Sequence, residues 1–312
     1  MSFTTTIKEE IAKISGTKSE IIAELSGFIR NNGYLNEYGL NLTTENESIC
    51  TRMASFLEDI YEVNVRKEVR DSLNFSKKNL YLLIIDNKLE LILKDIAFYD
   101  ENGDYLETPP QYIVGANEEI RAYLRGVFLS SGSINDPKTS RYHMELLINM
   151  PNEAVFVQKL LNIFDLNVKI LTRDKGYMLY IKESEKISDY LKLLNANKAV
   201  MYYENERVYR NKKNQANRLN NCEQANIDKV VATATIQLDY INTIEENLGE
   251  SLLDDKTKEA LEYRKKYPEA SLKELSEIIT VETGKTITKS GLNHRFRKIK
   301  ELALKFQKMS SK

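Results

Sequence analysis

The sequence has no tryptophan, two cysteines, two histidines and five prolines in 312 residues. Cys50 and Cys222 are too few for a disulfide framework, and their separation matches no metal-binding spacing, so two reduced thiols are expected. No run of about 18 apolar residues occurs, and we therefore expect no membrane-spanning helix. The first residues carry acids where a secretory signal needs an apolar core. We expect a soluble cytoplasmic protein.

The remaining composition is that of an ordinary globular chain. Hydrophobic residues make up 42% and charged residues 29%, which excludes wholesale disorder and fibrous repeats. At roughly 150 residues per domain, the length predicts two or three domains.

The net charge of −1 hides a polarised distribution of basic residues. Residues 285–312 contain nine Lys or Arg and one acid. The segment 207–222 has five bases and no acid, namely Arg207, Arg210, Lys212, Lys213 and Arg218. Such local patches attract anionic polymers whatever the net charge is, which makes a nucleic acid the first partner to consider. The alternative for each patch is a solvated helix face.

An internal repeat occupies the first two hundred residues. The segment ELSGFIRNNG, Glu24 to Gly33, recurs 99 residues later as YLRGVFLSSG, Tyr123 to Gly132. The strands and helices predicted after each copy follow the same order. We predict one pseudo-symmetric α+β domain over residues 1–205, with copies at about 18–98 and 117–194.

Each repeated helix has one bulky face and one face of small residues. At 100° per residue, Gly27 lies opposite an apolar stripe in the first copy, and Gly126 does so in the second. Glycine inside a helix costs about 1 kcal/mol relative to alanine, so its presence favours close backbone approach. We predict that the two helices pack through their small faces. The alternative is two unrelated buried helices with incidental glycines.

These segments resemble diverged copies of the LAGLIDADG motif of homing endonucleases. The resemblance implies paired helices above an antiparallel DNA-binding saddle, with one carboxylate per copy holding a divalent cation. The corresponding positions here are Asn32 and Ser131, which cannot supply a charged oxygen ligand. We expect no metal, no cofactor and no catalysis. His143 and His294 lack metal-ligating neighbours at suitable spacing.

The second half of the chain predicts a linker and a helical domain. Residues 206–224 are rich in Asn and bases with little apolar periodicity, so we interpret them as a basic linker. Its five bases either contact phosphates or are simply solvated. The domain 225–312 is predicted to contain helices at 226–248, 252–267, 271–279 and from Thr288 onward.

The last two helices are typical of a helix-turn-helix, which we place at about 271–307. Ser271 and Glu274 form a capping box, and Thr288 is a candidate N-cap. The outward face of the last helix is rich in hydrogen-bond donors. We expect base contacts from Ser290, Asn293, His294 and Arg297, and phosphate contacts from Lys289, Arg295 and Lys298. The alternative is a generic three-helix bundle with a solvated basic face.

The degenerate repeat, the stretch RVYRNKKNQANRLNNCEQANIDK and the ending SLKELSEIITVETGKTITKSGLNHRFRKIKELA together resemble the WhiA family over essentially the whole chain. The ending is also similar to the promoter-reading helix-turn-helix of sigma factors. The resemblance implies a cytoplasmic, nucleoid-associated protein that binds double-stranded DNA without enzymatic activity, and a transcription factor or RNA polymerase as protein partner. It implies regulation of sporulation in some bacteria, and cell division and chromosome segregation in others. Two alternatives are an active endonuclease and an adaptor that binds a partner protein through the saddle.

Overall fold

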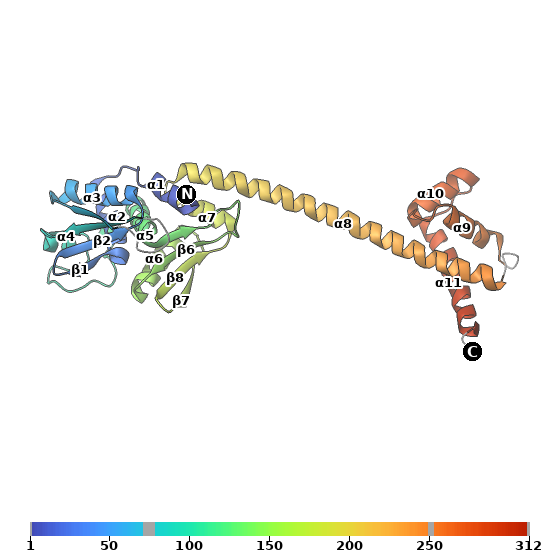
Figure 1. Cartoon of the computed structure of the whole chain (residues 1–312). Coiled ribbons are helices and arrows are strands. Elements are labelled where there is room, and N and C mark those ends of the chain that lie inside the picture. Colours follow the sequence, from blue (N-terminus) through green and yellow to red (C-terminus); the bar gives the residue numbers. More distant parts are fainter. Residues whose placement is uncertain (1, 71–78, 249–252, 311–312) are drawn as a thin grey trace. The chain divides into compact units, whose positions relative to one another are not determined.

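The computed structural model describes residues 2–70, 79–248 and 253–310, and its contacts divide the chain into two units, Met1–Arg210 and Asn211–Lys312 (Figure 1). The N-terminal unit opens with helix α1 (Phe3–Ile11), which precedes the repeat. The first copy consists of α2 (Lys18–Asn32), β1 (Tyr34–Asn36), β2 (Gly39–Thr44), α3 (Glu47–Tyr61), β3 (Arg66–Arg70), β4 (Leu80–Ile85) and α4 (Leu89–Asp95).

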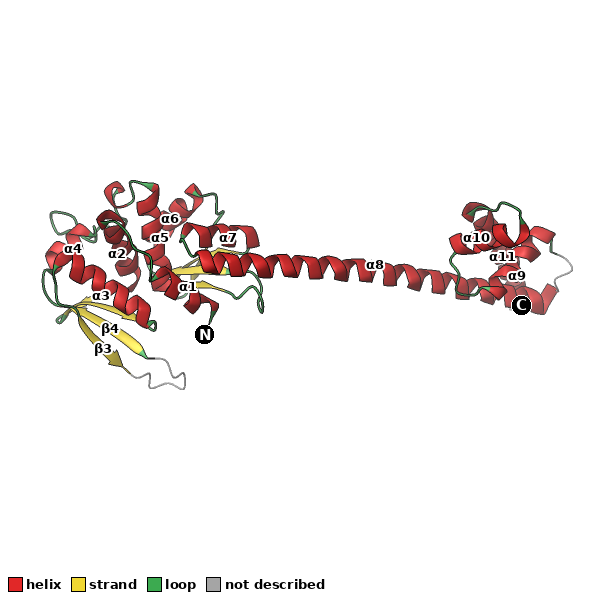
Figure 2. Ribbon diagram, turned by 90° about the horizontal axis from the view of Figure 1, so that it is seen from above, coloured by secondary structure: helices red, strands yellow, loops and turns green. Residues whose placement is uncertain are grey.

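The second copy repeats this order after the short helix η1 (Gln111–Ile113). It consists of α5 (Asn117–Ser131), β5 (Gly132–Ile134), β6 (Met144–Ile148), α6 (Pro151–Ile163), β7 (Lys169–Arg173), β8 (Gly176–Ile181) and α7 (Ser184–Leu193). Each copy forms a four-stranded antiparallel sheet, in the orders β1-β2-β4-β3 and β5-β6-β8-β7. The predicted fold, a pseudo-symmetric α+β repeat, is confirmed, and Figure 2 shows helices gathered against the strands.

The paired helices α2 and α5 touch at their glycines. A Cβ atom added to Gly126 would lie 2.0 Å from the carbonyl oxygen of Glu24, and one added to Gly27 would lie 2.3 Å from that of Tyr123. Only hydrogen fits in these positions, because the two backbones are in contact. The predicted packing through the small faces is therefore confirmed.

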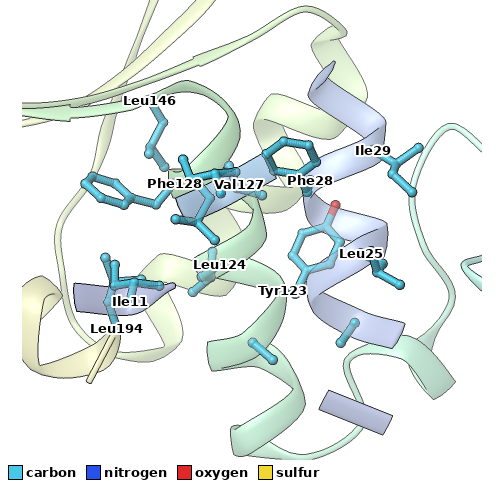
Figure 3. Close-up of a cluster of buried hydrophobic side chains, with 14 of the residues drawn as sticks. Ile11, Leu25, Phe28, Ile29, Tyr123, Leu124, Val127, Phe128, Leu146 and Leu194 are labelled. Atoms are coloured by element: carbon cyan, nitrogen blue, oxygen red, sulfur yellow. The ribbon is translucent and has the colours of Figure 1, made fainter. Parts of the chain in front are cut away.

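The bulky faces of the same helices fill a core that is continuous across both copies. Figure 3 shows Leu25 and Phe28 of α2 beside Leu124, Val127 and Phe128 of α5. The sheets complete this core with alternate residues, because side chains along a strand point to opposite faces. The inward residues include Leu40, Leu42, Leu83 and Ile85 in the first copy and Met144, Leu146, Leu179 and Ile181 in the second.

Helix α1 closes the N-terminal unit. Its apolar residues Ile7 and Ile11 are fully buried. The Glu10 carboxylate accepts hydrogen bonds from the backbone amides of Lys198 (2.7 Å) and Ala199 (3.0 Å), in the first turn of α8 (Asn197–Leu248). A carboxylate at a helix N-terminus satisfies free amides and interacts favourably with the helix dipole. Helix α1 thus caps α8 from a distance of almost 190 residues in sequence.

The segment 206–224, predicted as a basic linker, is helical throughout, whereas the sequence pattern predicted a helix only from 226 onward. The whole segment belongs to α8, which continues to Leu248. Its sequence contains no glycine or proline, so no residue interrupts the helical hydrogen bonds, although asparagine is a weak helix former. The predicted helix at 226–248 is the second half of the same element.

Three further helices complete the C-terminal unit, namely α9 (Asp255–Lys266), α10 (Leu272–Thr283) and α11 (Lys289–Ser310). The predicted start of the first, Leu252, lies outside the described residues. The capping box of Ser271 and Glu274 is present, and the Thr288 hydroxyl accepts a hydrogen bond from the Gly291 amide (3.1 Å). Helix α10 runs to Thr283, four residues beyond the predicted end, and Gly284 closes it with a left-handed backbone (φ +70°).

A second core holds these helices together. It consists of Ile241 and Ile244 from α8, Leu253 just before α9, Ala260 and Leu261 from α9, Leu275 and Ile279 from α10, and Leu292, Phe296, Ile299 and Ala303 from α11. The predicted inward stripe of the last helix is therefore buried. The outward face of α11 is left to solvent. No helix in the described part of the chain has the length and apolar character needed to span a bilayer.

Candidate nucleic-acid interface

The positions that carry acids in homing endonucleases have structural roles here. The Asn32 amide donates to the carbonyl of Thr43 and accepts from the amide of Thr43, both at 2.8 Å. Both polar ends of Asn32 are thus used to join α2 to β2. The Ser131 hydroxyl donates to the Val127 carbonyl of its own helix (3.3 Å). Among the described residues, no three His, Cys, Asp or Glu side chains are grouped to hold a metal ion.

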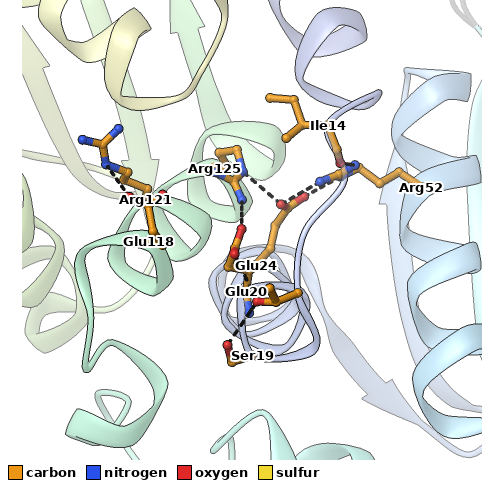
Figure 4. Close-up of polar contacts among 9 residues, drawn as sticks. Ile14, Ser19, Glu20, Glu24, Arg52, Glu118, Arg121 and Arg125 are labelled. Carbon is orange, nitrogen blue, oxygen red and sulfur yellow. Dashed lines mark hydrogen bonds and ion pairs between the residues drawn. The ribbon is translucent and has the colours of Figure 1, made fainter.

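A buried ionic network lies elsewhere on the paired helices (Figure 4). Glu24 of α2, 1% exposed, accepts from Arg52 of α3 through both oxygens (2.6 and 2.9 Å) and from Arg125 of α5 (3.1 Å). Arg125 also lies 3.7 Å from the carboxylate of Glu20. A buried charge is tolerated when opposite charges and hydrogen bonds surround it, so these ions hold the two copies together.

Sequence reasoning missed this network, although one signal was available. Glu24 and Arg125 stand inside otherwise apolar helical segments, and long charged residues are seldom fully buried unless they are paired. The pairing itself joins residues 28 and 101 positions apart, which periodicity along one segment does not show.

The N-terminal half of α11 presents a free polar surface. Five of its predicted DNA-contacting side chains are exposed and make no hydrogen bond or ion pair with any described residue: Lys289, Ser290, Asn293, His294 and Arg297. Ser290, His294 and Arg297 lie opposite the buried stripe of Leu292, Phe296 and Ile299, whereas Asn293 is at its edge and Lys289 is exposed at the start of the helix. Hydrogen-bond donors and two positive charges, those of Lys289 and Arg297, are therefore available together on the outside of this helix.

The other two predicted phosphate contacts are occupied within the protein. Arg295 bonds to the Glu259 carboxylate (2.7 Å) and to the Lys256 carbonyl (3.0 Å), and only 19% of its side chain is exposed. Lys298 donates to Asp254, the N-cap of α9. The bonds from Lys298 and Thr257 lower the pKa of Asp254. The charges on this flank of α11 are thus balanced by α9.

The basic residues at 207–218 also fall into two groups, those bound within the protein and those without a partner. Arg207 pairs with Glu204 (2.8 Å) and Glu185 (3.0 Å), and these bonds raise its pKa. Arg210 donates to the carbonyls of Pro137 (2.6 Å) and Ser140 (2.7 Å). These two arginines thus hold the beginning of α8, as far as Arg210, within the N-terminal unit. The remaining bases of the segment are exposed and without a partner among the described residues: Lys212, Lys213 and Arg218.

Comparison with known proteins covers almost the whole chain. Three family models match in order: "WhiA N-terminal LAGLIDADG-like domain" over residues 18–99, "WhiA LAGLIDADG-like domain" over 120–213 and "WhiA C-terminal HTH domain" over 216–303. The "Probable cell division protein WhiA" of Enterococcus faecalis is 38% identical and covers 100% of both chains. That of Brevibacillus brevis is 37% identical and covers 98% of both.

A solved structure shares the architecture. The crystal structure of full-length DUF199/WhiA from Thermatoga maritima superposes with a TM-score of 0.59 at 22% sequence identity, over 98% of this chain and 99% of the other. At this identity the likeness is one of fold. It extends across the LAGLIDADG-like part and the helical C-terminal part.

Proposed function

Because this chain belongs to the WhiA family, we propose that it is a sequence-specific DNA-binding protein that acts in cell division. Its relatives carry the name of a cell division protein, and its C-terminal unit matches a helix-turn-helix domain. The proposal extends to regulation of transcription and to chromosome segregation, in the cytoplasm at the nucleoid. Sporulation genes are proposed targets where the host forms spores.

The unpartnered surface of α11 is the observation that carries this proposal. A helix in the major groove reads bases with donors near its N-terminus, where Arg suits guanine and Asn suits adenine. We assign base contacts to Ser290, Asn293, His294 and Arg297, and a phosphate contact to Lys289. Arg295 and Lys298 enter only if DNA displaces the acids of α9 that now bind them.

In this proposal the two domains have different functions, one as a structural scaffold and the other as the part that reads the DNA sequence. In this proposal residues 1–205 form the scaffold, 206–224 the basic linker segment within α8, and 225–312 the reader. Lys212, Lys213 and Arg218 can add phosphate contacts, whereas Arg207 and Arg210 hold α8 in place.

The experiment that tests the proposal is fluorescence anisotropy. It measures the affinity of the full chain for its preferred duplex and for a scrambled duplex over a series of salt concentrations. Arg297→Ala should cost about 1–3 kcal/mol on the preferred duplex and relax the preference at one base pair. Lys305→Ala is the matched control, because it removes one exposed charge from the same helix, more than two turns beyond Arg297. Unchanged affinity in Arg297→Ala would refute the role of α11 as reader.

We also propose that the protein does not cleave DNA. Cation-assisted hydrolysis needs the ion to be held by charged oxygens, and Asn32 is committed to the backbone of β2. Purified protein incubated with plasmid DNA and Mg²⁺ or Mn²⁺ should leave the plasmid intact. Nicking that disappears in Asn32→Ala or Ser131→Ala would instead support the endonuclease alternative.

One observation favours a second role, as an adaptor for a transcription factor or RNA polymerase. On the face of the second sheet opposite the core, Leu147, Met178 and Leu171 lie side by side in register across β6, β8 and β7. Leu147 and Leu171 are 48% and 46% exposed. Leu147→Asp combined with Leu171→Asp should leave DNA binding intact and abolish complementation of a deletion strain. Full complementation would remove this role.

A further inference from the structure

A groove runs between the second half of α8 and one flank of α11, within the C-terminal unit. Its volume is about 280 Å³. Phe296 of the core lies at its base. Its polar lining comes from both helices: Thr233, Gln237 and Tyr240 of α8, and Asn293, Arg297 and Lys300 of α11.

The groove has positive charge and no acid in its lining. Neither Arg297 nor Lys300 makes a hydrogen bond or ion pair with any residue that the structure describes. The opposite flank of α11 is different, because Glu259 and Asp254 of α9 neutralise Arg295 and Lys298 there. The unbalanced charge of this helix is thus confined to its outer face and to the flank beside α8. An anion would meet attraction in the groove and no repulsion from its walls.

Gln237 is a second, independent indication of a ligand. The side chain lies in the stripe of α8 that packs on α11, between Ala234 and Ile241, and is only 8% exposed. Its Oε1 atom is buried and has no hydrogen-bond partner among the described residues. An unsatisfied buried polar atom costs about 1–3 kcal/mol. Rotation of the terminal amide by half a turn exchanges Oε1 for the Nε2 donor, which an acceptor in the groove would satisfy.

We propose that this groove binds one phosphate of the DNA backbone, with Lys300 as its cation and the side chains of Gln237 and Tyr240 as neutral donors. The inference rests on the proposed function, because it requires α11 to lie in the major groove. A helix there has a sugar–phosphate strand beside each flank, and phosphate contacts fix the register of the base contacts. Helix α8 then belongs to the DNA-binding surface, and Arg297 marks the boundary between the base-reading face and the groove.

The test combines protein variants with neutral phosphates. The preferred duplex is synthesised as a series in which one phosphate at a time is replaced by an uncharged methylphosphonate. Affinity is measured for the full chain, for Lys300→Ala, for Tyr240→Phe and for the control Lys305→Ala. Each variant is checked by circular dichroism. Lys300 and Lys305 are exposed, and Tyr240→Phe keeps the aromatic ring that packs against the core.

We expect one methylphosphonate position at which the wild type and Lys305→Ala lose about tenfold in affinity, and at which Lys300→Ala loses nothing further. Lys300→Ala should also reduce the salt slope by about one unit on all sequences alike. Tyr240→Phe should also reduce the contribution of this phosphate to affinity, but by less than Lys300→Ala does, because it removes a neutral hydrogen-bond donor and no charge. If Lys300→Ala behaves like Lys305→Ala at every position, the groove is not a phosphate site.

This failure is distinguishable from failure of the proposed function. If the full chain prefers its duplex and Arg297→Ala relaxes that preference, the proposal that α11 reads the DNA sequence is supported even when Lys300→Ala has no effect. If no duplex binds above the scrambled control, both proposals fall.

Discussion

Replacing Gly126 by alanine should destabilise the N-terminal unit, although alanine is the better helix former. The new methyl carbon would lie 2.0 Å from the Glu24 carbonyl oxygen and 2.8 Å from the Phe28 amide nitrogen. Both atoms belong to the backbone of α2, so no side-chain rotation relieves the contact. The helices must separate by more than 1 Å, which disturbs the packing of Phe28, Val127 and their neighbours on both sides.

The expected cost follows from two opposing effects. Overpacking of a dense core costs about 1–3 kcal/mol, and more when backbone must move. Removing a helical glycine returns about 1 kcal/mol. We therefore expect a net loss on the order of 2 kcal/mol in the free energy of unfolding.

Gly291→Ala in α11 is the matched control, because its added carbon meets nothing closer than 3.4 Å. This variant should be neutral or more stable by up to about 1 kcal/mol. Urea unfolding of the full chain, followed by circular dichroism, measures both variants. A Gly126→Ala protein as stable as the wild type would refute the close backbone contact between α2 and α5.

Two further predictions concern buried charges. Glu24→Ala leaves Arg52 without its counter-ion and Arg125 with only the more distant carboxylate of Glu20, so it should lower the unfolding free energy by about 3–5 kcal/mol, measured by urea unfolding. Glu90→Ala, which removes an exposed pair with Lys94, should have no such effect, and equal behaviour of the two variants would contradict a stabilising network. Burial lowers the pKa of Lys8 from 10.5 to about 8, so the unfolded state binds more protons between these values and stability should rise with pH across that window. The free energy of unfolding, measured at pH 7.5 and 10, should rise more in the wild type than in Lys8→Met. If the two proteins show the same pH dependence, the lowered pKa of Lys8 is excluded.

The features that could be predicted from the sequence are those that depend on residues close together within one segment. Side-chain volume along ten residues placed Gly27 and Gly126 on a small face, and that face is where the helices meet. The buried stripe of α11 followed from apolar spacing in the same way. The helical state of 206–224 was missed because asparagine and basic residues weaken periodicity without breaking a helix.

The partners of charged residues were beyond reach from the sequence. Arg295 and Arg297 are near neighbours in sequence and both basic, but only Arg295 faces an acid of α9. Likewise, nothing near Arg210 in sequence indicates that it binds carbonyls some 70 residues earlier. Such contacts depend on how distant segments fold together, so composition assigns a partner class to a basic run but not a role to each base.

The cap that Glu10 provides for α8 has a consequence for how the chain is made. Synthesis proceeds from the N-terminus, so α1 leaves the ribosome long before residues 198 and 199, whose amides it binds. Until then Ile7 and Ile11 lack part of their surroundings, including Leu194. Contacts between such distant positions form late because a long loop must close first. Completion of the N-terminal unit therefore waits for nearly two-thirds of the polypeptide, and until then the Glu10 carboxylate of α1 is without the backbone amides that it binds in the folded protein.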